Sequence, residues 1–117
     1  MDRNFFDMVF DAGFPGEVGY RFHAEMQGTG IGYRGQLVKL GVFMEAAHGI
    51  ASFKKLEEHH IYEFLEFLRQ KGFKESTLKT YITAVRQAHR WGGHLFSDDF
   101  APPAAAGYEK WKTTEGG

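Results

Sequence analysis

Three successive segments of this chain carry apolar side chains at α-helical spacing, and each segment ends at a glycine. The segments are residues 33–49, 57–72 and 75–93, and within each the apolar residues recur every three or four positions. A glycine just beyond a helix accepts the left-handed conformation that closes the last turn. The pattern predicts three amphipathic helices. Their predicted buried residues are Leu37, Leu40, Met44, Ala47, Ile61, Phe64, Leu65, Leu68, Leu78, Tyr81, Ile82, Val85 and either Ala88 or His89.

The segments around these helices are less regular. Residues 2–10 and 18–27 predict short helices, and GTGIG at Gly28–Gly32 predicts a flexible joint. We expect an extended connector at residues 51–56, and a frayed end or a weak helix after Pro103.

No stretch shows the alternation typical of strands. We therefore expect an all-α fold, a small bundle of four to five helices. Its predicted divisions are an N-terminal arm over residues 1–29, the bundle over 30–100 and a linker or tail over 101–117.

Composition excludes several classes of protein. The 117 residues include no cysteine, which rules out disulfides and thiolate metal sites and favours a cytoplasmic location. No apolar run approaches the ~20 residues of a membrane-spanning helix. The net charge is −1, yet residues 34–90 hold ten basic and six acidic side chains between two acidic ends. The basic centre is the part of the chain to which a polyanion would bind.

The third predicted helix, in GFKESTLKTYITAVRQAHR, has a polar face suited to DNA. Lys79, Thr83, Arg86 and Arg90 are spaced 4, 3 and 4 apart, so they share one side of the helix. Arg and Lys supply charge to phosphates, and Thr and Gln supply neutral hydrogen bonds. A merely solvated helix face is the alternative interpretation. The predicted DNA-binding residues are Lys54, Lys55, Lys74, Ser76, Thr77, Lys79, Thr80, Thr83, Arg86, Gln87 and Arg90.

The three helices in order resemble the N-terminal core-binding domain of phage integrases and other tyrosine recombinases. The third matches the family pattern T-[IL]-x-x-Y-[IL]-x-x-[LV]-R, with Thr77, Leu78, Tyr81, Ile82, Val85 and Arg86 in place. IYEFLEFLRQKGF and YRGQLVKLGVFMEAA are similar to the two preceding family helices, and Leu56 matches the connector between them. The resemblance covers residues 30–103. It departs from the family at Lys74–Glu75, where Ser-Pro is common.

The resemblance implies a SAM-like domain that clamps duplex DNA, mainly through phosphates, during DNA integration and recombination. It implies double-stranded DNA as the partner, with self-association or contact with other recombinase protomers as a second expectation. Family catalysis resides in a separate domain with an Arg…His-x-x-Arg set and a tyrosine nucleophile. No His-x-x-Arg occurs in this sequence. We therefore predict no catalytic residue and no enzyme activity for this chain alone, and a structural role for Tyr81.

Two other groups of residues have simpler interpretations than a metal site or a phosphate-binding loop. Glu58, His59, His60 and Glu63 include metal-ligand residue types, but only two of them share one helix face, so a polar first turn is favoured over a metal site. GTGIG lacks the preceding strand and the following Lys-Ser/Thr of a phosphate-binding loop. We predict no metal and no small-molecule cofactor.

A helical module that binds protein is the alternative function. The near-neutral charge favours it, and so do four aromatic residues of the N-terminal arm that could dock on a partner: Phe5, Phe6, Phe10 and Phe14. SAM-like folds serve both kinds of binding, and a fold does not determine a function.

Overall fold

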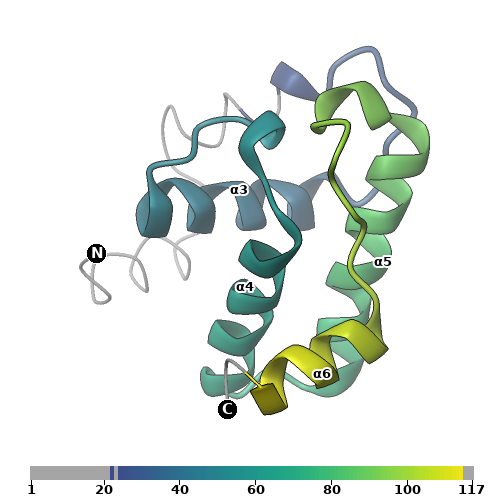
Figure 1. Cartoon of the computed structure of the whole chain (residues 1–117). Helices are drawn as coiled ribbons and strands as arrows, with labels where there is room; N and C mark the ends of the chain where they lie inside the picture. Colours follow the sequence, from purple (N-terminus) through teal and green to yellow (C-terminus); the bar gives the residue numbers. More distant parts are fainter. Residues whose placement is uncertain (1–21, 23, 115–117) are drawn as a thin grey trace.

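The described part of the chain contains helices and no strand, which confirms the all-α prediction. The computed structural model describes residue 22 and residues 24–114 (Figure 1). Short segments join four complete α-helices and two 3₁₀ turns in this part. The elements are α3 (Arg34–His48), η1 (Phe53–Lys55), α4 (Glu58–Gln70), α5 (Glu75–Trp91), η2 (Gly93–Leu95) and α6 (Ala105–Thr114).

The N-terminal arm is described only at its end. Phe5, Phe6, Phe10 and Phe14 lie outside the described residues. Phe22, Ala24 and Glu25 are helical, in agreement with the short helix predicted over residues 18–27. The buried ring of Phe22 lies against the backbone of α3 at Gly41, where a Cβ atom would come within 2.5 Å of the ring. A glycine in the middle of α3 therefore makes room for Phe22.

The end of α3 follows the prediction, but the connector after it does not. Gly49 has φ 67°, and its N–H donates to the carbonyl of Glu45, so it is the left-handed cap that the sequence predicts. Residues 51–56 were expected to be extended, but they contain the 3₁₀ turn η1. Phe53 and Leu56, three residues apart, are both buried. A turn of three residues brings these two side chains to the same side, which explains the correction.

The core lies where α3, α4 and α5 meet. In Figure 1, α4 and α5 run side by side in opposite directions, and α3 lies across the upper end of α4 and contacts α5 below its upper end. The predicted buried stripes are buried in all three helices, except that Ala47 is only half-buried. Phe64 lies at the centre of the core, with its ring centroid 5.2 Å from those of Phe43 and Tyr81. The helical periodicity thus identified the part of the core that α3, α4 and α5 supply.

The C-terminal segment is more ordered than a frayed end. Residues Ala105–Thr114 form α6, which packs on α4 (Figure 1). The buried Tyr108 donates its hydroxyl to Glu66 Oε2 at 3.0 Å. Glu66 also accepts from Arg69 and Gln70, and the Arg69 hydrogen bond is the main reason that the pKa of Glu66 is below its usual value. The buried Tyr108 side chain and its hydrogen bond to Glu66 therefore hold α6 against α4.

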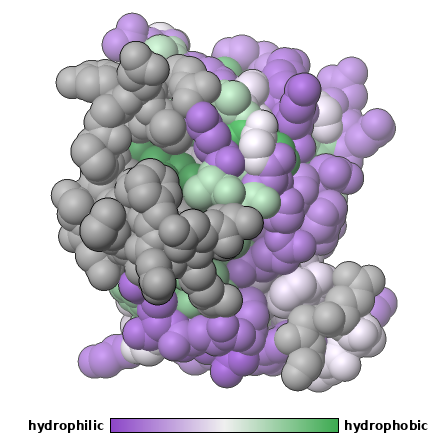
Figure 2. Space-filling view, turned by 90° about the vertical axis from the view of Figure 1, so that its left-hand side faces the viewer, coloured by the Kyte–Doolittle hydropathy of each residue, from purple (hydrophilic) through white to green (hydrophobic). Residues whose placement is uncertain are grey.

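No described helix has both the length and the apolar composition needed to cross a membrane. Figure 2 shows one face of the molecule, on which most of the coloured surface is hydrophilic and a smaller area is hydrophobic.

Candidate nucleic-acid interface

The burial of one side of α5 determines which side chains its other side presents. One side of α5 is buried in the core, and the outward side carries the exposed Lys79, Thr83 and Arg86. The helix begins after Lys74, whose backbone is extended. It ends at Gly92, where a Cβ atom would lie 2.6 Å from Ile31 Cδ1. The outward side of these five helical turns is the surface that the sequence assigns to DNA.

The structure places most of the predicted DNA-binding residues of α5 on this outward side. Of the predicted residues between Lys74 and Arg90, those exposed are Lys74, Ser76, Lys79, Thr83, Arg86 and Arg90, and those half-buried are Thr77, Thr80 and Gln87. We call this set the α5 face. Whether these residues contact DNA remains a prediction.

The α5 face is basic, and most of its charges are unpaired. Residues 74–90 contain four Lys or Arg side chains and one carboxylate, Glu75. Within the described part of the chain, none of Lys74, Lys79 and Arg90 takes part in an ion pair. These side chains can therefore bind an anion without first breaking a salt bridge.

Two residues of the α5 face also hold neighbouring segments. Gln87 Oε1 accepts the N–H of Gly32 at 2.8 Å, and Arg86 Nη1 donates to the carbonyl of Pro103 at 3.2 Å. Arg86 keeps further N–H donors for another acceptor. These contacts join segments 55 and 17 residues apart in sequence, so helical periodicity cannot reveal them.

The Gly28–Gly32 run packs on α5 and is not the free joint that the sequence predicted. Ile31 is buried, and Arg34 donates to the carbonyls of Ile31 and Thr29. Gly30 lies against the ring of Trp91. The buried Ile31 side chain explains the correction, because it attaches the loop to the core.

Two segments border the α5 face on opposite sides. The Gly28–Tyr33 loop lies beside Gln87 and Trp91, while the chain around Pro103 lies beside Arg86. Near its beginning α5 shares a shallow hollow with α6, in which Lys79 and Glu109 are both lining residues. The open strip between these borders contains Ser76, Thr83 and Arg90.

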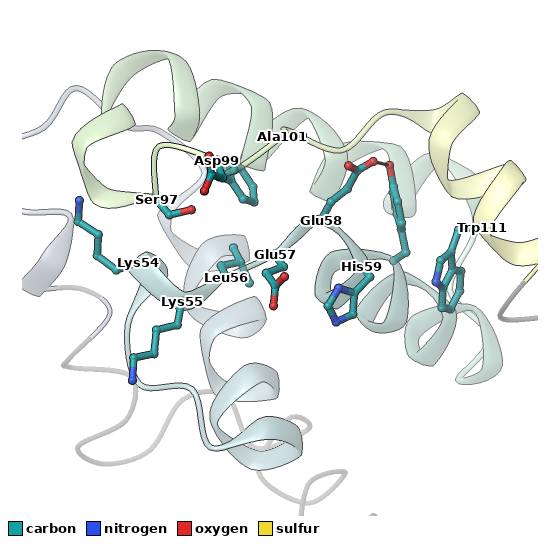
Figure 3. A pocket seen from close by; sticks show the side chains of 12 residues that line it. Lys54, Lys55, Leu56, Glu57, Glu58, His59, Ser97, Asp99, Ala101 and Trp111 are labelled. Carbon is teal, nitrogen blue, oxygen red and sulfur yellow. Dashed lines mark hydrogen bonds between the residues drawn. The ribbon is translucent and has the colours of Figure 1, made fainter.

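Lys54 and Lys55 belong to a different surface. They line a cleft of about 600 Å³ together with three carboxylate residues, Glu57, Glu58 and Asp99 (Figure 3). Lys54 Nζ also donates to the carbonyl of Phe96 at 3.3 Å. The carboxylates would repel a polyanion here. Lys54 and Lys55 therefore do not extend the basic surface of the α5 face.

Sequence reasoning missed Trp91 as a surface feature. Its side chain is 59% exposed at the end of α5. Trp91 follows Gln87 by four residues, and this spacing places the two side chains on the same side of the helix. This spacing was the feature of the sequence from which the outward position of Trp91 could have been predicted.

Tyr81 has the structural role that the sequence predicts. It is 5% exposed and packs edge-on against Phe64. Burial raises the pKa of its hydroxyl to about 12, which makes it a poor nucleophile at neutral pH.

Comparison with known proteins agrees with this architecture. The family model of the phage integrase N-terminal SAM-like domain matches residues 25–92, which is more than half of the chain. No curated protein and no solved structure gives a significant match. The matched segment runs from the end of the arm through α3, α4 and α5, and it includes the whole α5 face. The chain therefore belongs to the phage integrase N-terminal SAM-like domain family.

Proposed function

We propose that the α5 face binds duplex DNA through its phosphates, as part of DNA integration or recombination. The observation that supports the proposal most strongly is the set of exposed basic side chains on α5, of which Lys74, Lys79 and Arg90 lack ion-pair partners among the described residues. Family membership supports a role related to tyrosine recombinases. Half or more of the hydrogen bonds in protein–DNA complexes go to the sugar–phosphate backbone.

The start of α5 suits a phosphate as well. No side chain caps this helix, so N–H groups of the first turn are available to an anion. The helix dipole adds partial positive charge at the same end, beside Lys74 and Ser76. Thr83 and Arg90 supply further hydrogen-bond donors along the open strip, toward the other end of the helix. The proposed contact thus runs along one side of α5.

The proposal assigns binding and no chemistry to the described residues. Tyr81, a tyrosine within the family-matched segment, is buried and inaccessible to a phosphodiester. Its ring packs against Phe64 in the core. DNA binding by α5 would position the duplex for a reaction carried out elsewhere.

The dependence of affinity on salt tests the proposal. If three or four phosphates are neutralised, the logarithm of the binding constant should fall against the logarithm of salt concentration with a slope of roughly −3 to −4. Fluorescence anisotropy of a labelled duplex, measured at several salt concentrations, gives this slope. Arg90→Ala should make the slope shallower by about 1.

A matched control and a clear contrary result complete the test. Lys110→Ala removes one exposed positive charge from α6 and should leave the slope unchanged. A slope near zero, or no saturable binding at low salt, would contradict phosphate binding and favour the protein-binding alternative.

A further inference from the structure

We propose that Glu57, His59 and His60 form a binding site for a divalent transition-metal ion of the zinc class. The three side chains lie at the beginning of α4, and one potential ligand atom from each falls within 4.8 Å of the others. Helical spacing places Glu63 near these histidines, but the sequence favoured a polar first turn over a metal site. In the structure Glu63 instead pairs with His48, at 2.6 Å, and Glu57 takes its place beside the two imidazoles. This site does not depend on the proposed DNA binding.

The local fold brings the donors together. Glu57 has extended backbone just before α4, and His59 and His60 belong to the first turn. The residues on either side, Leu56 and Ile61, are buried in the core, so the start of the helix is firmly placed. Figure 3 shows Glu57 and His59 near each other at the cleft that they both line. A metal ion would therefore meet donors already positioned by packing.

Two hydrogen bonds of the helix cap already engage the proposed ligands. The Glu57 side chain accepts the backbone N–H of His60, and the His60 ring accepts the backbone N–H of Glu57, which must be exchanged for the metal. The N–H of Glu57 donates to His60 Nδ1 at 3.0 Å. An ion on Nδ1 displaces this N–H directly, and an ion on Nε2 requires the ring proton to move to Nδ1, which breaks the same bond. Either route costs about 1 kcal/mol. The exchange lowers the affinity without preventing binding.

The surroundings define which ions fit. Two nitrogens and one carboxylate suit zinc, copper, nickel or cobalt, whereas calcium and magnesium prefer oxygen ligands. The helix dipole opposes a cation here, but the Glu57 carboxylate and the neighbouring Glu58 offset it. His48 contacts the His60 ring while its Nε2 is engaged by Glu63, so it is not counted as a ligand. The open side of the site leaves room for water as a further ligand.

Metal titration of the full chain tests the site. Protein stripped with a chelator would be titrated with Zn²⁺ by calorimetry and with Co²⁺ by visible absorption. We expect one ion per chain and no competition from excess Mg²⁺. His59→Ala should weaken binding at least about tenfold, because even residues behind metal ligands change affinity by roughly 10–100-fold. Since His59 is exposed, this variant should remain folded, which circular dichroism would check.

Controls separate this site from general histidine binding. His94→Ala removes an exposed histidine outside the cluster and should not alter the affinity. Glu57→Gln, which keeps the shape but removes the charge, should weaken binding as His59→Ala does. Absence of saturable Zn²⁺ binding, or equal affinities of the His59→Ala and His94→Ala variants, would overturn the proposal.

Discussion

Simultaneous replacement of Lys74, Lys79 and Arg90 by alanine is expected to weaken duplex binding about 100-fold at low salt. Each lost charge-assisted contact with a phosphate contributes on the order of 1 kcal/mol at an exposed surface, and three such losses multiply. All three side chains are exposed and free of ion pairs within the described residues, so the fold should be unaffected. Anisotropy titration with a labelled duplex measures the loss, and thermal unfolding checks the fold.

Two further variants make this result specific to the α5 face. Lys54→Ala combined with Lys55→Ala should reduce affinity far less, because these lysines lie in a cleft with Glu57, Glu58 and Asp99. Lys110→Ala combined with Lys112→Ala, on α6, serves as the control for total charge. Similar losses in all three variants would mean that binding depends on net charge alone and not on α5.

Phe64→Ala is expected to lower the free energy of unfolding by about 3–5 kcal/mol. Phe64 has no exposed surface, and its ring contacts Phe43 of α3 and Tyr81 of α5. Its removal would leave a cavity where the three family-matched helices meet. Since a protein of this kind is stable by roughly 5–15 kcal/mol in total, the variant should lose much of its stability.

Urea unfolding followed by circular dichroism measures this loss. Phe64→Leu is the matched control, because it keeps most of the apolar volume and should cost clearly less than the alanine variant. If Phe64→Ala lowered the free energy of unfolding by less than about 1 kcal/mol, the ring would not be central to the core.

Local periodicity in the sequence predicts the helices and the core well. A residue such as Leu78 is buried because its neighbours three and four positions away are also apolar, and this relation is visible in the sequence. Gly49 likewise ends α3 as predicted, because its left-handed conformation is a local property. The polar side of α5 follows from the same spacing, since what is not buried faces outward.

Contacts between distant segments leave no such pattern. The hydrogen bonds between Gln87 and Gly32, and between Tyr108 and Glu66, join residues 55 and 42 positions apart. Each depends on how the helices are placed relative to one another, and a single polar residue does not reveal its partner. For this reason the docked α6 and the attached Gly28–Gly32 loop emerged only in the structure.

The candidate sites also combine features that local spacing predicts with features that depend on contacts between distant segments. The sequence correctly placed Lys79, Thr83 and Arg90 on one exposed side of a helix. It grouped Lys54 and Lys55 with them on charge alone, whereas the structure surrounds these lysines with carboxylates. It also treated Glu58, His59, His60 and Glu63 as a polar first turn, whereas the structure groups the two histidines with Glu57, the residue just before the helix. Residues at helix ends do not follow the spacing of the helix interior.

Mapping of backbone amide shifts during titration with duplex DNA tests the central claim most directly. Uniformly ¹⁵N-labelled protein would be titrated at low salt, and the shifts would be followed residue by residue. Binding by the α5 face predicts that the largest changes cluster between residues 74 and 90, led by the exposed residues Ser76, Lys79, Thr83 and Arg90. A cluster on the cleft around Lys54 and Lys55, a cluster on α6, or no change at all would contradict it.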